Sequence, residues 1–344
     1  MQKLSYKTSG VDIDIANATK SEMAKSLNSD DARVLNKAGA FATLFDGSFP
    51  EYKEPVLVFK TEEPGSKQKL ALEHNSIETI CYDLINHLIN DAIVMGAKPL
   101  SVQDCIVCGK MDKEVILKMV SAFSRACKEN GCVLTGGETS EQPSVIEAGT
   151  YILTASIVGV VEKEKIIDGS KIKEGDVVLA IASSGIHTNG FSLVKKIMEQ
   201  NPKILKENID GQTFIKNILT PHFCYYNSLK DLFSSPELVG LAHITGGGIK
   251  ENLNRILPPD LDALIDISKI QILNIFKTLK KFGDLEDNDM IRTFNLGVGM
   301  TAVVRENFAD EVKKHLQKFG INSYEIGKIT KGNQQVNVEG KLNW

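Results

Sequence analysis

Three short segments of the sequence combine glycines with hydroxyl, imidazole or carboxylate side chains. The first is Thr135–Pro143 (TGGETSEQP), which follows a predicted strand. Its adjacent glycines let backbone amides approach a ligand closely, and Glu138 and Glu141 offer the oxygen ligands that Mg²⁺ prefers. A tight turn followed by solvated acids has the same pattern. This segment alone therefore leaves both interpretations open.

The second segment, Ser183–Gly190 (SSGIHTNG), lies between a predicted strand and a predicted helix. A strand, a glycine loop and a helix start direct several backbone N–H groups at one point, where the helix dipole favours a phosphate. His187 and Asn189 add side-chain donors. The alternative is an ordinary turn in which Asn189 caps the following helix. The concentration of Ser, His and Asn side chains favours a functional loop.

The third segment, His243–Gly248 (HITGGG), ends in three consecutive glycines. Such a run is costly in chain entropy and usually indicates close backbone approach or an anion-binding nest. A flexible loop is the rival interpretation. A fourth candidate is the polar stripe of Asp83, His87 and Asp91, which share one face of a predicted helix because they lie four residues apart. A solvated face is the alternative there.

Two familiar patterns are incomplete. Gly65–Lys67 matches the end of a P-loop, but the earlier glycine of G-x-x-x-x-G-K-[ST] is absent. Lys67 therefore stays a candidate phosphate contact outside that architecture. Gly297 and Gly299 lack the third glycine of a dinucleotide fingerprint.

Four cysteines offer a zinc-site alternative, because the spacings Cys105-x₂-Cys108 and Cys127-x₄-Cys132 resemble two halves of such a site. However, Cys127 falls inside an amphipathic helix and Cys132 opens a strand, where small buried thiols are common. The pattern therefore favours core packing over zinc.

The elements that must position these groups alternate between helix and strand in both halves, which indicates mixed α/β structure. Helical spacing of apolar residues predicts helices at Ser76–Met95 and Lys113–Asn130. A further short helix is expected around Ser29–Phe45. Strands are predicted at Pro55–Lys60, Pro99–Val107, Cys132–Leu134, Tyr151–Val161, Asp176–Ala182, Ala263–Ile267 and Met300–Val304.

Length and composition bound the function. A chain of 344 residues with 42% hydrophobic residues predicts two globular domains, which we divide at a polar hinge near Ile167–Gly175. The net charge of −4 argues against a nucleic-acid partner. The polar amino terminus and the lack of an apolar run of about 18 residues predict neither signal peptide nor membrane span. Six cysteines do not suggest a disulfide framework, so a cytoplasmic location is expected.

Together these segments identify a resemblance to the aminoimidazole ribonucleotide synthetase (phosphoribosylformylglycinamidine cyclo-ligase) family over nearly the whole chain. The ordered matches are far more specific than any single motif. They are Tyr6–Asp14, Glu54–Val58, Lys67–Ala71, Asn90–Leu100, Gly136–Glu141, Gly159–Lys173, Ser183–Lys196, Ala242–Gly248 and Arg292–Met300.

The resemblance implies a homodimer of two-domain α/β subunits, with an amino-terminal domain (residues 1–168) that binds ATP and metal and pairs its sheet into a β-barrel at the dimer interface. The carboxy-terminal domain (residues 169–344) then carries the phosphate-binding loops. The implied reaction uses ATP and Mg²⁺ to convert formylglycinamidine ribonucleotide to 5-aminoimidazole ribonucleotide in purine synthesis.

The resemblance also implies roles for individual residues. His187, Lys67 and Asp91 are the expected catalytic residues, and His187 is our choice for an acid–base or phosphate-contacting role. Metal ligands are expected at Glu62, Asp91, Glu138 and Glu141. The nucleotide is expected at Gly65, Ser66, Lys67, Asn90, Asp91, Gly136, Gly137, Glu138 and Thr139. Substrate and phosphate groups are expected at Ser183, Ser184, Gly185, His187, Asn189, His243, Thr245, Gly246, Gly247 and Gly248.

The chain departs from the family in one important loop. The family usually reads TDGVGTK where this chain has Thr61–Lys67 (TEEPGSK), which lengthens the carboxylate at Glu62 and stiffens the loop at Pro64. Rival interpretations are a sister ATP-using enzyme of the same fold, such as a thiamine-phosphate kinase, a selenophosphate synthetase or a hydrogenase-maturation dehydratase, and an inactive nucleotide-binding paralogue. A zinc-dependent interaction module is a third.

Overall fold

The computed structural model describes residues 17–20, 22–23, 27, 31–36 and 40–344. Contacts group the chain into two units. The first runs to Ala92 and takes in Lys98–Glu162, and the second comprises Ile93–Ala97 and Lys163–Trp344. Each unit combines helices with a mixed sheet, which confirms the expectation of two mixed α/β domains. The matched stretch at Tyr6–Asp14 lies outside the described residues.

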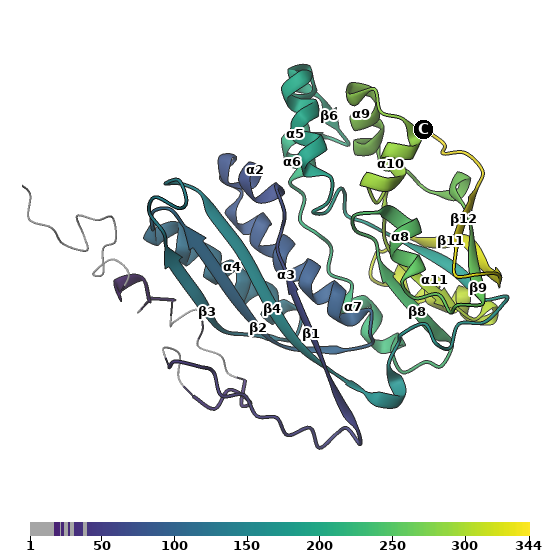
Figure 1. Cartoon of the computed structure of the whole chain (residues 1–344), viewed down its shortest axis with the longest axis horizontal. Coiled ribbons are helices and arrows are strands. Elements are labelled where there is room, and N and C mark those ends of the chain that lie inside the picture. Colours follow the sequence, from purple (N-terminus) through teal and green to yellow (C-terminus); the bar gives the residue numbers. More distant parts are fainter. Residues whose placement is uncertain (1–16, 21, 24–26, 28–30, 37–39) are drawn as a thin grey trace, which may run out of the picture. The chain divides into compact units, whose positions relative to one another are not determined.

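The first unit is a four-stranded sheet in the order β1-β4-β2-β3, with helices α3 and α4 on one face (Figure 1). Strands β1 and β4 are antiparallel to their neighbours, whereas β2 and β3 are parallel. The sheet is open in the described part of the chain. Its elements are β1 (Pro55–Glu62), α2 (Lys67–Glu73), α3 (Ile77–Ile93), β2 (Lys98–Cys108), α4 (Lys113–Glu129), β3 (Val133–Glu141) and β4 (Tyr151–Glu162).

Helix α4 shows why the sequence folds this way. Its apolar residues recur at helical spacing from Ile116 to Cys127, and these are buried. The helix begins after Asp112, whose side chain accepts hydrogen bonds from the backbone of Glu114 and Val115. On the sheet, alternate residues of β1 such as Leu57 and Phe59 stay exposed. One face of the sheet therefore packs on helices and the other carries exposed apolar side chains.

The second unit is a six-stranded sheet in the order β12-β9-β11-β5-β10-β8. Strands β5 (VVLAIA) and β10 (VGMTAVV) are continuous apolar runs, which is typical of strands covered on both faces, and every residue of β10 is buried. The other principal elements are α5 (Phe191–Gln200), β8 (Leu238–His243), α8 (Gly248–Asn254), β9 (Leu261–Asp266), α9 (Asn274–Gly283), α10 (Asp287–Thr293), α11 (Ala309–Gln317), β11 (Ser323–Lys331) and β12 (Val336–Glu339); β5 spans Val177–Ala182 and β10 Val298–Val304.

Smaller elements connect these. They are the two-stranded pair β6 (Asn208–Ile209) and β7 (Gln212–Thr213) and the short helices α6 (Phe214–Ile218) and α7 (Tyr226–Leu229). No helix in the described part of the chain has both the length and the apolarity that a membrane crossing needs.

The helix expected around Ser29–Phe45 is wrong for the described residues between 31 and 46. There, Asn36 Nδ2 donates to the Ala42 carbonyl at 2.7 Å, and Asn36 Oδ1 accepts from the Leu44 N–H at 2.9 Å. An isolated bridge pairs Val34 with Phe45. Asparagine competes with helices by such side-chain-to-backbone bonds, and here it closes a loop instead.

Candidate active site

The topology of the second unit brings two of the predicted loops to one edge of its sheet. Strands β5 and β8 both pair antiparallel to β10, so they run parallel to each other. In register, Met300 of β10 faces Ile181 on one side and His243 on the other. The carboxyl ends of β5 and β8 therefore lie level, and residues 183–190 and 244–248 leave the sheet at the same edge.

The loop after β5 is held from inside by a residue that the sequence analysis did not single out. Asn295 Nδ2 donates to the carbonyls of Gly185 (3.0 Å) and Ile186 (3.3 Å), and Asn295 Oδ1 accepts from the Gly297 N–H (2.8 Å). Ser183 Oγ also contacts Gly185 O at 2.9 Å. The only sequence signal for Asn295 was its place in the matched stretch Arg292–Met300.

Helix α5 begins after Gly190, which has a φ of 82° and no side-chain cap. Asn189 therefore does not cap the helix, and that alternative interpretation of the loop is wrong. A Cβ at Gly190 would lie 2.4 Å from Phe294 Cε1, so glycine is required there. The Nδ2 atom of Asn189 is buried and has no hydrogen-bond partner among the described residues. A buried donor of this kind is costly unless a ligand satisfies it.

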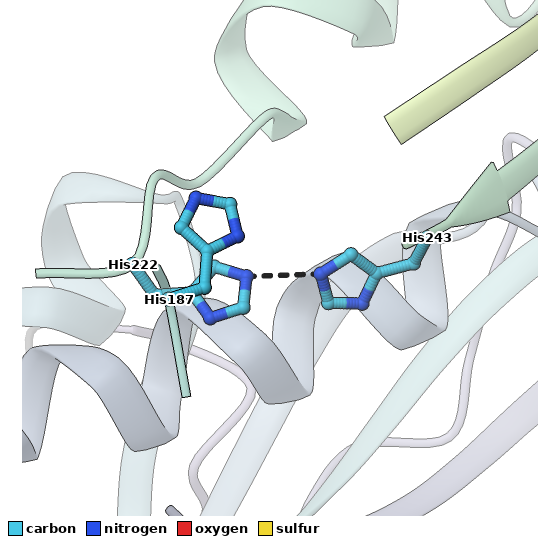
Figure 2. Close-up of side chains that lie close together, drawn as sticks. All are labelled: His187, His222 and His243. Carbon is cyan, nitrogen blue, oxygen red and sulfur yellow. Dashed lines mark hydrogen bonds between the residues drawn. The ribbon is translucent and has the colours of Figure 1, made fainter. Parts of the chain in front are cut away.

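Three buried histidines meet in this unit (Figure 2). The rings of His187 and His222 stack with centroids 3.8 Å apart, and His222 Nε2 lies 2.9 Å from His243 Nε2. Each residue offers a ring nitrogen within 4.8 Å of the others. His187 and His243 were predicted site residues, but His222 was missed because nothing in its local sequence marks it. One of two hydrogen-bonded imidazoles must donate. A proton therefore lies between His222 Nε2, in the loop before α7, and His243 Nε2, at the end of β8.

The backbone of His187 is itself unusual. Its φ of 64° lies in the left-handed region, which is uncommon for a residue other than glycine. Its Nε2 accepts from the Ser184 N–H at 3.3 Å, and the Ser184 hydroxyl donates to the Pro221 carbonyl at 2.7 Å. Such outliers persist only where the surrounding structure fixes them, and they concentrate at functional sites.

The glycine run after β8 is fixed rather than flexible. Asn252 Nδ2 donates to the carbonyls of Gly246 (3.1 Å) and Gly248 (2.9 Å), and Thr245 Oγ1 contacts Asn252 Oδ1 at 3.2 Å. Gly247 and Gly248 have φ values of 90° and 63°. Their N–H groups donate to the carbonyls of Arg292 and Thr245, so those two amides do not face an open anion nest.

In the first unit, β1 and α3 bring opposite charges together. Lys60 Nζ lies 3.0 Å from Glu62 Oε2 and 3.0 Å from Asp91 Oδ2. His87 Nε2 lies 3.7 Å from the same two oxygens. Partial burial opposes the charge on Lys60, but Asp91 and Glu62 outweigh it, and the pKa of the Lys60 amine is raised. His87 and Asp91 of the predicted polar stripe thus face Lys60 and Glu62 of β1 rather than solvent alone. Lys60 was not predicted as a site residue.

Lys67 opens helix α2 with its side chain fully buried. Its Nζ lies 2.7 Å from Asp83 Oδ2 and 2.9 Å from Asp83 Oδ1, and neither side chain is exposed. Burial lowers the pKa of the Lys67 amine, although the Asp83 carboxylate opposes this. The predicted phosphate contact of Lys67 therefore starts from an amine that already has a partner. Gly65, with a φ of 63°, and Ser66 precede it at the start of α2.

The segment Gly136–Glu141 was placed after a strand predicted to end at Leu134, but it forms most of strand β3, which pairs in parallel with β2. Gly137 is required because a Cβ there would lie 2.2 Å from the Asp104 carbonyl oxygen and 2.5 Å from Asp104 Oδ1. Burial raises the pKa of the Asp104 carboxyl to about 7. Glu138 Oε1 accepts from the Thr139 N–H at 2.9 Å, and Glu141 Oε1 accepts from the Met111 N–H at 2.7 Å.

These donor sets differ in how well they fit Mg²⁺. Glu62 and Asp91 already share one ammonium group, so the pair as it stands does not fit a resident divalent cation. Glu138 and Glu141 each accept a backbone hydrogen bond with one carboxylate oxygen and lie on the same strand. Because they are three residues apart on a regularly paired strand, their side chains point to opposite faces of the sheet. The two carboxylates therefore do not converge on one ion, and either one fits magnesium only as a single ligand beside phosphate oxygens and water.

Comparison with known families assigns both halves of the chain. The amino-terminal domain of AIR synthase related proteins matches residues 30–161, and their carboxy-terminal domain matches residues 173–339. The chain is 40% identical to a phosphoribosylformylglycinamidine cyclo-ligase of Carboxydothermus hydrogenoformans over 98% of this chain and 99% of the relative. A protein of the same name from Paraburkholderia phymatum is 41% identical over 95% of this chain and 92% of the relative.

Solved structures share the fold at lower identity. The HypE protein of E. coli has a TM-score of 0.69 at 14% identity and covers 94% of both chains. A thiamine-monophosphate kinase from Stenotrophomonas maltophilia has a TM-score of 0.65 at 15% identity and covers 96% of both. Fold and domains thus define an AIR synthase related protein. At about 40% identity over nearly the full length, the chain belongs to the phosphoribosylformylglycinamidine cyclo-ligase family.

Proposed function

We propose that this protein uses ATP to close the imidazole ring of 5-aminoimidazole ribonucleotide from formylglycinamidine ribonucleotide, a step of de novo purine synthesis. The observation that carries the proposal is the 40% identity, over 98% of the chain, to a relative named for this activity. Sister enzymes of the same fold are only 14–15% identical, so they support the fold alone.

The chemistry requires activation of a poor leaving group. The γ-phosphoryl group of ATP is transferred to the formyl amide oxygen, and ADP departs. An amidine nitrogen then attacks the same carbon, a C–N bond forms, and the C–O bond breaks as inorganic phosphate leaves. Positioning and charge stabilisation are the main contributions that a protein makes to such steps.

The loops of the second unit are the proposed substrate site. The buried Asn189 Nδ2 supports this role, as does the strained backbone of His187. His187 is the proposed acid–base or phosphate-contacting group, since an imidazole titrates near neutral pH. The proposed contacts to substrate and phosphate groups are Ser183, Ser184, Gly185, His187, Asn189, His243, Thr245 and Gly246. Gly247 and Gly248, whose N–H groups already donate to Arg292 and Thr245, shape the same loop.

The first unit is the proposed nucleotide site, and Mg²⁺ enters it as the MgATP complex. A HypE structure with the same fold was solved in complex with ATP, which supports a nucleotide ligand. Of the expected metal ligands, Glu138 and Glu141 point to opposite faces of β3, and Lys60 engages Asp91 and Glu62 in the resting protein. The phosphate groups and water therefore supply most ligands of the proposed magnesium ion, with a single carboxylate of the chain beside them. The proposed nucleotide contacts are Gly65, Ser66, Lys67, Asn90, Asp91, Gly136, Gly137, Glu138 and Thr139.

The proposal includes a homodimer in the cytoplasm, with residues 1–168 pairing their sheets into a β-barrel. Exposed apolar side chains on one sheet face support a partner there, since Leu57 is 44% and Phe59 71% exposed. A groove of about 520 Å³ on this face is lined by both. A second copy of the chain would cover them.

Turnover of formylglycinamidine ribonucleotide with MgATP tests the proposal, with the product followed by its diazo-coupled colour. We expect colour only with ATP, and a loss of at least about 100-fold in Asp91→Asn, because the Lys60 ammonium group beside the proposed nucleotide site then loses the carboxylate that positions it. Asp260→Asn, an exposed carboxylate, is the matched control and should keep wild-type rates. If folded protein binds ATP but gives no colour, the proposal is wrong and the chain is an inactive paralogue. The altered loop Thr61–Lys67 is the feature that supports this alternative.

A further inference from the structure

The relationship between Lys60 and two predicted metal ligands carries an inference about cation binding. Lys60 and Glu62 lie two residues apart on β1, so their side chains share the sheet face that packs on α3. Helix α3 supplies Asp91 and, four residues earlier, His87. The result is one ammonium group 3.0 Å from a carboxylate oxygen of each acid.

The carboxylate oxygens that face Lys60 are Glu62 Oε2 and Asp91 Oδ2, and these same oxygens lie 3.7 Å from His87 Nε2. Only 21% of the Glu62 side chain and 18% of the Asp91 side chain are exposed. A pair of carboxylates this sheltered from water needs a positive partner. The structure provides it from the chain itself.

A lysine and a divalent cation compete for this position. Mg²⁺ requires oxygen ligands at about 2.0–2.1 Å in octahedral geometry, whereas an ammonium group hydrogen-bonds to carboxylates at about 2.7–2.9 Å. Both cannot lie between the same two oxygens. A divalent ion entering there would meet a unit positive charge a few ångströms away and would have to displace the lysine.

We propose that Lys60 is a built-in counter-cation for the Glu62–Asp91 carboxylate pair, so that this pair takes up no divalent metal ion in the native protein. The ligand class that the lysine excludes is a hard divalent cation such as Mg²⁺ or Mn²⁺. Removing the lysine charge therefore creates a metal site where the native chain has an ion pair.

Binding of Mn²⁺ to the full chain without nucleotide or substrate tests this, with free Mn²⁺ followed by electron paramagnetic resonance. Relative to the wild type, Lys60→Met should gain one Mn²⁺ equivalent per chain. The affinity of that equivalent should exceed any wild-type binding at the pair by about tenfold or more, the effect of removing one nearby unit charge. Lys60→Arg keeps the charge and should match the wild type.

A double variant assigns the new equivalent to the pair. Lys60→Met/Asp91→Asn should lose the Mn²⁺ equivalent that Lys60→Met gains, because one of the two carboxylates is gone. If Lys60→Met does not fold, Lys60→Gln removes the same charge with a polar side chain. Thermal unfolding checks that each variant is folded.

Two outcomes overturn the proposal. In the first, the wild type already binds one Mn²⁺ ion at the pair, and Asp91→Asn alone abolishes this binding. That result means that Mn²⁺ displaces the lysine. In the second, folded Lys60→Met and Lys60→Gln both gain nothing, which means that the pair has no affinity for a divalent ion. Because no substrate is present, either failure is distinct from a failure of the proposed cyclo-ligase activity.

Discussion

Lys67 Nζ lies 2.7 Å from Asp83 Oδ2, and both side chains are fully buried. Breaking a buried pair by removing one partner leaves an uncompensated charge, which costs about 3–5 kcal/mol. We therefore expect Lys67→Met to lower the free energy of unfolding by that amount. Lys67→Met/Asp83→Asn should recover much of the loss, because neither charge is then left alone. Urea unfolding of the two variants measures both effects.

The exposed pair of Lys196 and Glu199 is the control for this prediction. Its atoms lie 3.4 Å apart with both side chains more than half exposed, and such pairs contribute about 0–1 kcal/mol. Lys196→Met should change the free energy of unfolding by less than that. Equal costs for Lys67→Met and Lys196→Met would contradict the buried-pair account.

The buried carboxyl of Asp104 makes stability depend on pH. Burial raises its pKa in the folded state to about 7, from the ordinary value of 3.8 for an exposed aspartate. Between these values the folded state binds more protons than the unfolded state, so stability falls as the pH rises. At 1.36 kcal/mol per pH unit, raising the pH from 5 to 8 should remove about 2–3 kcal/mol through this group.

Asp104→Asn removes the titrating group and should remove this part of the pH dependence. Urea unfolding at pH 5 and pH 8 measures it as the difference between the variant and the wild type. The exposed Asp260→Asn is the matched control and should follow the wild type. Identical pH slopes for Asp104→Asn and the wild type would show that Asp104 is already ionised in the fold.

Local patterns predicted the elements but not their partners. Helices α3 and α4 follow from apolar spacing, and β5 from a continuous apolar run. The side-by-side placement of the loops after β5 and β8 depends on β10, a strand more than fifty residues later in the chain than β8. No window of sequence contains that pairing.

Non-local packing also explains what was missed in the sites. The sequence did not pair Lys67 with Asp83, because the two residues are sixteen positions apart and lie on different helices. Gly136–Glu141 was placed after the predicted strand Cys132–Leu134, with a ligand site and a tight turn as the two interpretations, and glycine is depleted in strands. Pairing with β2 overrides that preference, since Gly137 packs on the Asp104 backbone where a side chain would clash.

His222 is expected to position His243 for the proposed reaction. Its Nε2 lies 2.9 Å from His243 Nε2, and its ring stacks on His187. His222→Phe keeps an aromatic ring for stacking but deletes the hydrogen bond. We expect kcat/KM to fall about tenfold, the size of one lost buried hydrogen bond. The pH profile of kcat/KM should also shift, because the partner that holds the His243 tautomer is gone.

His222→Gln separates positioning from packing. Its amide offers a donor and an acceptor, so it should retain more activity than His222→Phe and a profile closer to the wild type. A purely structural role would lower the thermal midpoint in both variants without moving the pH profile. That result would exclude a positioning role for His222.

Gly299 packs directly against a residue of the candidate site, His187. It lies on β10 beside a register shift, and a Cβ there would lie 2.0 Å from the Tyr225 hydroxyl oxygen and 2.8 Å from His187 Cε1. The Tyr225 hydroxyl donates to the Ala182 carbonyl at 2.7 Å and is fully buried, so it has little room to move. Gly299→Ala must therefore displace the tyrosine, the histidine or the strand.

Overpacking of this kind costs about 1–3 kcal/mol, and we expect Gly299→Ala to lower the free energy of unfolding by that amount. Because the new Cβ would lie 2.8 Å from His187 Cε1, turnover of the proposed substrate should fall further than the loss of folded protein explains. Gly47→Ala is the control, since a Cβ there meets nothing within 4 Å. Urea unfolding and turnover per folded chain measure the two effects. A Gly299→Ala protein with wild-type turnover per folded chain would contradict the expected link between packing at Gly299 and the position of His187.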